Sequence, residues 1–101
     1  MSANRLFSPA VTDFLKAFGN EKRQEIFLTF FADGSEHNIS EVAGGAHVAQ
    51  STASEHLAIL KRAGVLVSHK VEKEVFYRLN RAEIQARIEE IRALLNCCQE
   101  P

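Results

Sequence analysis

The chain has 101 residues, enough for one domain with a modest hydrophobic core. Apolar residues make up 46% and charged residues 25%, the balance of a globular domain, and no apolar run reaches the ~18 residues of a membrane span. The net charge of −1 hides an uneven distribution, because residues 47–81 contain six lysines and arginines against three glutamates. This locally basic segment suits contact with phosphates, although a solvated surface would show the same count.

Two amphipathic helices are predicted at the start of the chain. Ser8 is a candidate N-cap with Pro9 at the first helical position, and Gly19 ends this helix. Asn20 caps the second helix, which is expected to end at Gly34. Residues at helical spacing give each helix an apolar face, and in the aromatic-rich second helix this spacing predicts core positions rather than a ligand site. These faces comprise Val11, Phe14, Leu15 and Phe18 in the first helix, and Ile26, Phe27, Phe30 and Phe31 in the second.

A helix-turn-helix is predicted in the middle of the chain. Ser40 is expected to cap a short helix, which the adjacent Gly44 and Gly45 would end early. A turn at residues 47–50 leads into a longer helix over residues 51–64. A short helix, a tight turn and a second helix in this order are typical of the motif. The longer helix would turn three apolar residues inward, Ala53, Leu57 and Leu60.

The C-terminal third of the chain predicts a hairpin and one more helix. The hydrophobic period changes from 3.6 to 2 after Gly64, which favours antiparallel strands over residues 65–71 and 74–79. Asn80 is expected to cap a helix over about residues 80–98. Apolar residues recur along it at spacings of 4, 3, 4 and 3, the pattern of a helix that pairs with another chain. They are Ile84, Ile88, Ile91, Leu95 and Cys98.

The expected fold is therefore mostly α with a small β-hairpin, in the order α-α-α-α-β-β-α of a winged helix-turn-helix, as one domain over residues 1–101. The stretches "LKAFGNEKRQEIFLTFF" and "QSTASEHLAILKRAGVL", the latter followed by "VFYRL", resemble the ArsR/SmtB family of bacterial repressors over about residues 11–80. The resemblance implies a repressor that binds an imperfect palindrome in double-stranded operator DNA as a homodimer. Its first and last helices would form the dimer interface, with Val11 and Phe14 contributed by the first helix.

The candidate DNA contacts lie at the start of the longer helix and in the hairpin, or wing. Short polar side chains on the face away from the apolar stripe can reach base edges or phosphates in a major groove. Cations of the wing would reach phosphates or the minor groove, although a solvated turn is the alternative for each of them. The candidates are Gln50, Ser51, Thr52, Ser54 and Glu55 in the helix, and His69, Lys70, Lys73 and Arg78 in the wing.

Two of the assignments in the helix have an alternative, and the turn of the wing differs from the family pattern. Thr52 and Glu55 also match a capping box, in which they would serve only to start the helix. Glu55 departs from the polar residue that the family often places there, and it can either accept from cytosine N4 or repel phosphate. The wing also lacks the glycine that is usual in the family, so a different turn is expected.

Cys97 and Cys98 are the candidate inducer site. The family's two common metal sites lack their ligands, because Asn38 and Ser40 replace cysteines and the last helix contains no His or Asp. The adjacent thiols suit As(III) or Sb(III), which favours three thiolates, so a third sulfur would come from the partner subunit or a small thiol. The alternatives are a redox or sulfide sensor, or a structural pair in a regulator that needs no inducer.

No catalytic activity and no organic cofactor are expected, because no nucleophile–base motif or phosphate-binding glycine loop is present. A protein-interaction module without DNA binding is the alternative from a different class. The two adjacent cysteines form no disulfide framework and the N-terminal residues contain no apolar leader, so a cytoplasmic protein without membrane contact is expected.

Overall fold

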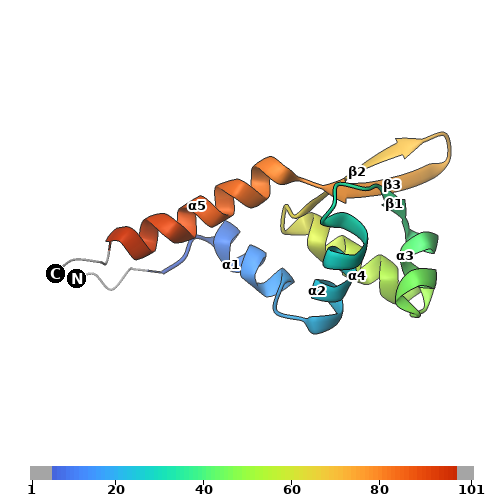
Figure 1. The fold of residues 1–101 in the computed structure, drawn as a ribbon, viewed down its shortest axis with the longest axis horizontal. Coiled ribbons are helices and arrows are strands. Elements are labelled where there is room, and N and C mark those ends of the chain that lie inside the picture. The colour runs from blue at the N-terminus through green and yellow to red at the C-terminus, as the bar shows by residue number, and fades with distance from the viewer. Residues whose placement is uncertain (1–5, 98–101) are drawn as a thin grey trace.

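The computed structural model describes residues 6–97, which contain five α-helices, a π-helical segment and three strands (Figure 1). The helical elements are α1 (Pro9–Ala17), α2 (Glu21–Ile26), η1 (Phe27–Phe31), α3 (Ile39–Ala46), α4 (Gln50–Arg62) and α5 (Arg81–Cys97). The strands are β1 (His37–Asn38), β2 (Leu66–Val71) and β3 (Glu74–Leu79). The predicted winged helix-turn-helix order is confirmed, with one strand more than expected. Among the described helices, none combines the length and the apolar character that a membrane span requires.

The predicted N-caps of the first two helices are confirmed. The side chain of Ser8 accepts a hydrogen bond from the backbone N–H of Val11 at 3.2 Å, and that of Asn20 accepts one from Arg23 at 2.9 Å. The second helix is not uniform, because α2 gives way after Ile26 to the π-helical η1. This wider turn was not predicted, since the apolar spacing is compatible with both helix types.

The start and end of α3 differ from the prediction. Asn38, not Ser40, is the N-cap, and it forms a capping box with Glu41 in which each side chain bonds the other's backbone N–H. The helix continues through both glycines and ends at His47, which adopts a left-handed conformation with φ 58°. Gly45 has a packing role instead, because a Cβ there would lie 2.4 Å from the ring of Phe30.

The strands form a three-stranded antiparallel sheet in the order β1-β3-β2. The predicted hairpin is confirmed, with a two-residue turn in which Glu72 has a φ of 59° in place of the usual glycine. The short strand β1 pairs with β3 through His37 and Asn38, in a segment predicted to be a polar connector. Two residues are too few for an alternation pattern, so only the tertiary pairing defines this strand.

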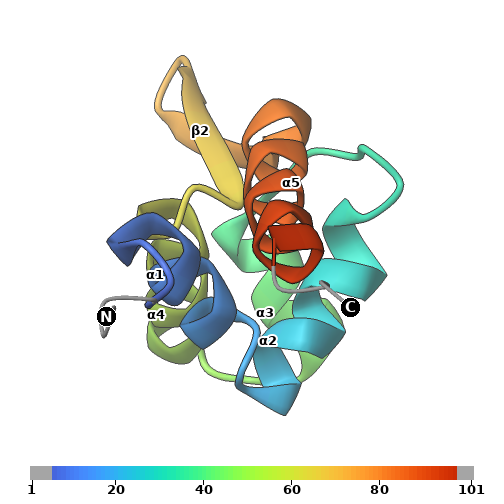
Figure 2. The ribbon, with the colours of Figure 1, turned by 90° about the vertical axis from the view of Figure 1, so that its left-hand side faces the viewer.

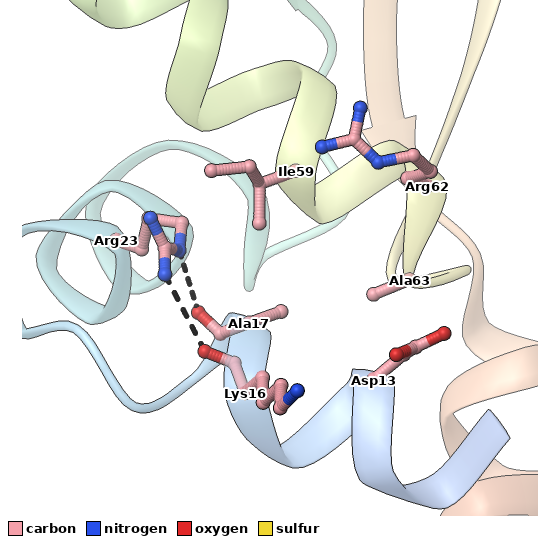
Figure 3. A pocket seen from close by; sticks show the side chains of 7 residues that line it. All are labelled: Asp13, Lys16, Ala17, Arg23, Ile59, Arg62 and Ala63. Atoms are coloured by element: carbon pink, nitrogen blue, oxygen red, sulfur yellow. Dashed lines mark hydrogen bonds between the residues drawn. The ribbon is translucent and has the colours of Figure 1, made fainter. Parts of the chain in front are cut away.

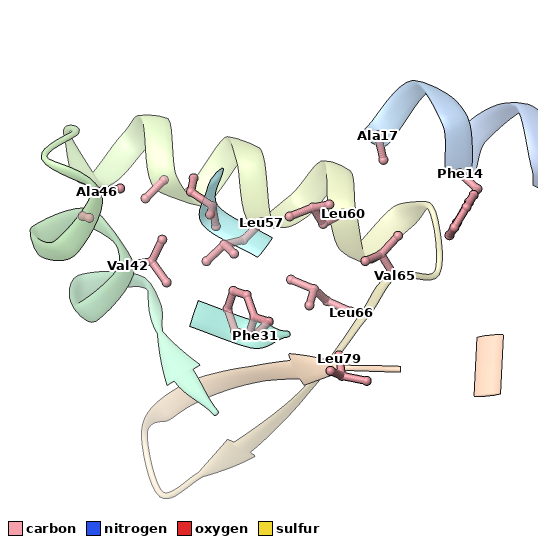
Figure 4. Packing of buried hydrophobic residues seen from close by; sticks show 13 residues of the cluster. Phe14, Ala17, Phe31, Val42, Ala46, Leu57, Leu60, Val65, Leu66 and Leu79 are labelled. Atoms are coloured by element: carbon pink, nitrogen blue, oxygen red, sulfur yellow. The ribbon is translucent and has the colours of Figure 1, made fainter. Parts of the chain in front are cut away.

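One hydrophobic core lies between α3, α4 and the sheet (Figure 4). Ala53, Leu57 and Leu60 of α4 are each 0% exposed, as predicted for the inner face of that helix. Phe31 packs below them from η1, and Leu66 and Leu79 close the core from the base of the hairpin. The inner face of α4 is therefore packed into the core, and this packing sets the orientation of its opposite face.

The α1–α5 end of the molecule separates residues that had been predicted to act together. Figure 2 shows α1 and α5 side by side at this end. Val11 and Phe14 are only 1% and 7% exposed within one chain, so their prediction as dimer contacts is wrong. They are on the inner side of α1, whereas Leu15, predicted to lie on the same apolar face, is exposed. The apolar residues of this nine-residue helix cover a broad sector around its axis. Their spacing therefore does not decide which of them pack against the chain's own core.

Candidate nucleic-acid interface

The start of α4 carries polar side chains on its outer face, opposite the buried apolar face of the same helix. Gln50, Ser51 and Glu55 are exposed, and Thr52 and Ser54 are half-buried. The capping-box alternative is wrong, because α4 begins one turn earlier than the pair requires, with Ala49 as its N-cap. No side chain of the described region caps this helix, so its first backbone N–H groups, at the positive end of the helix dipole, have no side-chain partner there. Such an end favours a phosphate.

Gln50 is tied to the preceding helix of the motif. Its side-chain amide nitrogen donates a hydrogen bond to the Ser40 hydroxyl at 2.7 Å, and both side chains remain exposed. The bond joins the first turns of α3 and α4, ten residues apart in the chain. Sequence reasoning missed this role of Ser40, which it treated as an N-cap. Nothing in the spacing of a serine and a glutamine indicates such a contact.

The predicted cations of the wing do not form one surface. Leu66 pairs with Leu79 and both are buried, so the face that they share is the core-facing side of the hairpin. Lys70 lies on this face, because side chains alternate along a strand. His69 and Arg78 lie on the opposite face. Lys73 sits in the turn between the strands and is exposed. If DNA meets the wing from one side, it can therefore contact side chains of both faces only at the tip.

Glu36 partly neutralises the outer face of the wing. Glu36 belongs to the connector that precedes β1, and its carboxylate lies 3.5 Å from His69 Nε2 and 3.8 Å from Arg78 Nε. All three side chains are more than two-fifths exposed, so these pairs contribute little to stability. Their consequence is electrostatic, because they reduce the positive field that Arg78 would present to a phosphate.

We expect Glu36→Gln to strengthen DNA binding a few-fold at low salt, since it releases the charge of Arg78. The gain should shrink as salt is added, because it depends on screened phosphate attraction. A gel-shift titration at several salt concentrations measures both. Glu25→Gln is the matched control, as it makes the same charge change at an exposed pair on α2. Equal gains in the two variants would mean that only net charge matters.

His56 links the recognition helix to the end of α1. Its Nδ1 lies 3.3 Å from Nη1 of Arg23, whose guanidinium also donates to the backbone carbonyls of Ala17 at 2.8 Å and Lys16 at 3.4 Å. Figure 3 shows Arg23 and its two carbonyl partners at the edge of a shallow hollow between α1 and α4. Arginine has only donors, so His56 must accept through Nδ1 as a neutral imidazole. Burial first, and then the charge of Arg23, lower the pKa of His56.

This lowered pKa predicts acid-sensitive folding. Well above pH 6.5, the ordinary pKa of histidine, the imidazole is neutral in both the folded and the unfolded chain and contributes no pH dependence. Below that pH the unfolded chain binds a proton that the folded chain resists, so the stability contributed by His56 falls. Urea titrations between pH 5 and 8 should show this slope, and His56→Asn, which keeps an acceptor near Nδ1, should flatten it. An unchanged slope in the variant would assign the effect to other groups.

The candidate inducer site falls at the edge of the described region. Cys97 is the last residue of α5, and Cys98 lies outside the described residues. Within residues 6–97, no three side chains among His, Cys, Asp and Glu lie close enough together to hold a metal ion. Asn38 and Ser40 have structural roles here, since Asn38 caps α3 and Ser40 accepts a hydrogen bond from Gln50.

The predicted stripe of α5 is divided between the core and the surface. Ile84 and Ile91 pack against the chain's own core, whereas Ile88 is 46% exposed and Leu95 67% exposed. Three more large apolar side chains are exposed on α1 or just before it, Leu6, Phe7 and Leu15. We call Ile88, Leu95 and these three the α1–α5 apolar surface. Exposed apolar side chains on two neighbouring helices suit contact with a partner protein.

A recognition-type α4, a short α3 before it and a β-hairpin after it define a winged helix-turn-helix protein. Residues 20–68 match the family described as "Bacterial regulatory protein, arsR family". The chain is 39% identical over 75 residues to the transcriptional activator HlyU of Vibrio cholerae, which is 74% of this chain and 68% of that protein. It is 42% identical over 45 residues to the HTH-type transcriptional repressor SmtB of Mycobacterium tuberculosis, 45% of this chain and 33% of that protein.

Solved structures agree with these sequence matches. The structure of HlyU from Vibrio cholerae has a TM-score of 0.66 and 33% identity, with 93% of this chain and 97% of that chain covered. A homodimeric winged helix-turn-helix DNA-binding domain from Mycobacterium bovis has a TM-score of 0.70 at 20% identity, and covers 99% of this chain and 93% of its own. The second likeness establishes the fold alone.

The chain therefore belongs to the ArsR family of bacterial regulatory proteins. It is a transcriptional regulator of the ArsR/SmtB type, and the prediction that it is not an enzyme is confirmed by the function of these relatives.

Proposed function

We propose that this regulator is a homodimer that binds an imperfect palindromic operator and represses transcription until an inducer reaches its C-terminal thiols. The observation that carries the DNA-binding role is the start of α4, where exposed polar side chains surround an uncapped helix end on a buried base. Figure 1 places α3, the start of α4 and the tip of the wing at one end of the molecule, away from the outer ends of α1 and α5. One end thus serves DNA while the other serves a partner subunit.

The DNA contacts proposed for α4 are Gln50, Ser51, Thr52, Ser54 and Glu55. Gln50 and the serines can bond base edges, and the half-buried Thr52 and Ser54 carry hydroxyl groups that can donate to phosphates. In the wing, Lys73 at the tip is the cation best placed for the minor groove, with Lys70 on one face and His69 and Arg78 on the other. Arg78 and His69 would have to leave Glu36 to contribute.

A selection of binding sites from a random DNA duplex pool tests this role. We expect selected sequences with two related half-sites, one helical turn or a multiple of it apart, bound with an affinity that falls steeply with salt. Changing Gln50 and Ser54 to Ala should reduce discrimination between operator and random DNA more than it reduces non-specific binding. Binding without sequence preference, or none at all, would favour the protein-interaction alternative.

The α1–α5 apolar surface supports the proposed homodimer. It contains five exposed large apolar side chains, which a single subunit would leave in water at a cost of roughly 1 kcal/mol or more each. The relative HlyU is named an activator and SmtB a repressor, so the direction of regulation needs its own measurement. A promoter fusion with and without the regulator provides it, and lower expression in its presence is the expected result.

For the inducer we propose As(III) or Sb(III), bound by Cys97 and Cys98 with a third thiolate from the partner subunit or a small thiol. The support is chemical and positional, because two adjacent cysteines come shortly after the exposed Leu95, which belongs to the surface proposed to meet the partner. An ion bound beside the dimer contact can shift the relative setting of the subunits only if it binds one setting more tightly.

Arsenite, antimonite and peroxide are each added to the regulator–operator complex, with and without reductant. We expect arsenite and antimonite to weaken binding at least tenfold, and the double variant Cys97→Ser, Cys98→Ser to bind DNA normally but lose this response. Release by peroxide alone, reversed by reductant, would favour the redox alternative. A double variant that still responds, or a parent protein that responds to none of the three, would remove the thiols as the sensor.

A further inference from the structure

We infer that Ser40 is a positioning residue that orients the Gln50 side chain to recognise an adenine in each operator half-site. This inference rests on the proposed DNA-binding function and adds to it the base that is recognised and the residue that prepares the contact. It starts from the 2.7 Å hydrogen bond between the Gln50 amide nitrogen and the Ser40 hydroxyl.

An amide side chain is ambiguous until something fixes its orientation. Rotation by half a turn exchanges the oxygen with the nitrogen, and the two ends recognise different base edges. In this structure the nitrogen of Gln50 points to Ser40, which takes one of its two hydrogens. Because Gln50 is exposed, its second amide hydrogen and its Oε1 are left to face a DNA groove.

This remaining pair of groups matches adenine. In the major groove adenine offers the N7 acceptor beside the N6 donor, and a glutamine satisfies both with one N–H and its oxygen. Guanine offers two acceptors, N7 and O6, so the oxygen of Gln50 would oppose an acceptor. The hydrogen bond to Ser40 needs only one of the two amide hydrogens, which leaves the other for adenine. Orientation and base preference are therefore compatible at the same time.

The first turn of α3 holds Ser40 in place. Its neighbours Asn38 and Glu41 form the capping box, with hydrogen bonds of 2.9 and 3.1 Å between each side chain and the other's backbone. The Asn38 side chain also lies 3.5 Å from a carboxylate oxygen of Glu74 in the wing. The capping box fixes the backbone of the turn that carries Ser40, and the Ser40 hydroxyl in turn bonds Gln50 of α4. This bond holds the amide before DNA arrives, which reduces the ordering required on binding.

Four variants of the full chain test the inference. Ser40→Ala removes the acceptor, Ser40→Thr keeps a hydroxyl, and Gln50→Ala removes the contact itself. Ser35→Ala is the matched control, because its hydroxyl bonds Asp33 in an exposed turn away from α4. Circular dichroism confirms folding, and binding is measured on the selected operator, on random DNA, and on an operator in which the adenine defined by Gln50→Ala is replaced by 7-deazaadenine, which lacks the N7 acceptor.

The parent protein should lose about tenfold in affinity when 7-deazaadenine replaces that adenine, as expected for one good base contact. Ser40→Thr and Ser35→Ala should show the same loss. Ser40→Ala should bind the natural operator several-fold more weakly, lose little further on the substituted operator, and bind random DNA like the parent. A merely structural role would weaken all three DNAs equally.

Three outcomes would overturn the inference. The first is that Ser40→Ala keeps the full tenfold sensitivity to 7-deazaadenine. The second is that Ser40→Ala weakens binding to random DNA as much as binding to the operator. The third is that Gln50→Ala changes the preference for no base. A parent protein without any sequence preference is a distinct result, since it overturns the proposed DNA-binding function itself together with this inference.

Discussion

Replacing Ile88 and Leu95 with glutamine is expected to separate the regulator into folded monomers. Both side chains belong to the α1–α5 apolar surface and are 46% and 67% exposed in the single chain, so neither is needed for the fold of a subunit. About half of each remains to be buried by a partner, which corresponds to roughly 1 kcal/mol per side chain. A symmetric dimer uses four such side chains, so the dimer should lose about 4 kcal/mol, or roughly a thousandfold in Kd.

The consequence for DNA binding should be equally large. A palindrome is bound tightly because two recognition helices are linked, and a monomer contacts only one half-site. Operator affinity should therefore fall by two orders of magnitude or more, whereas binding to random DNA falls less. Sedimentation equilibrium measures the assembly state, and gel shifts with whole and half operators measure the second effect.

A control on the same helix separates dimer contact from general damage to α5. Glu89→Gln with Arg92→Gln removes an exposed ion pair at 3.3 Å and leaves the net charge of the chain unchanged, as does the Ile88 and Leu95 variant. We expect this control to remain a dimer and to bind the operator like the parent. If both double variants dissociate, or neither does, the dimer does not use this surface of α5.

The second large effect is expected from Leu57→Ala, which should destabilise the domain by about 2–5 kcal/mol. Leu57 is 0% exposed and lies at the centre of the core beneath α4 (Figure 4). Truncation leaves a cavity that the surrounding helices fill only partly, and the total stability of a small domain is only about 5–15 kcal/mol. Because Leu57 supports the inner side of the recognition helix, operator binding should weaken before the chain unfolds completely.

Leu28→Ala is the matched control, since it makes the same chemical change at a leucine that is 68% exposed on η1. Its expected cost is below about 0.5 kcal/mol. Urea unfolding followed by circular dichroism gives both values, and the protein concentration must be held constant because dimer formation adds to the measured stability. Similar losses at Leu57 and Leu28 would contradict the packing described for α4.

Local signals in the chain were sufficient for most of the architecture. Ser8, Asn20 and Asn80 were predicted as N-caps, and each is observed to accept a bond from a backbone N–H three residues later. The change of period after Gly64 located the hairpin with its two-residue turn. These features depend on residues within one turn of each other, so the printed order of residues contains all the information that they need.

The capping of α3 and of α4 shows where local reasoning was incomplete. Asn38 and Glu41 carry a capping-box pattern in the sequence, yet the predicted N-cap was Ser40. At α4 the pair Thr52 and Glu55 carried the same pattern without forming a box. A chain can contain several similar capping patterns. The pattern that forms is the one whose helix start is compatible with the packing of the whole domain.

By itself, then, the sequence determined the five α-helices, the hairpin, their order and the family resemblance, because caps, periodicity and turn chemistry act over a few residues. Only the tertiary structure decided which apolar residues of α1 and α5 are covered by the chain's own core and which remain exposed. Only the tertiary structure, likewise, showed that Glu36 lies beside the wing cations and that Ser40 bonds Gln50. Those contacts join residues that are separated by ten or more positions, and their existence depends on how packed helices and strands are set in space, which no local pattern encodes.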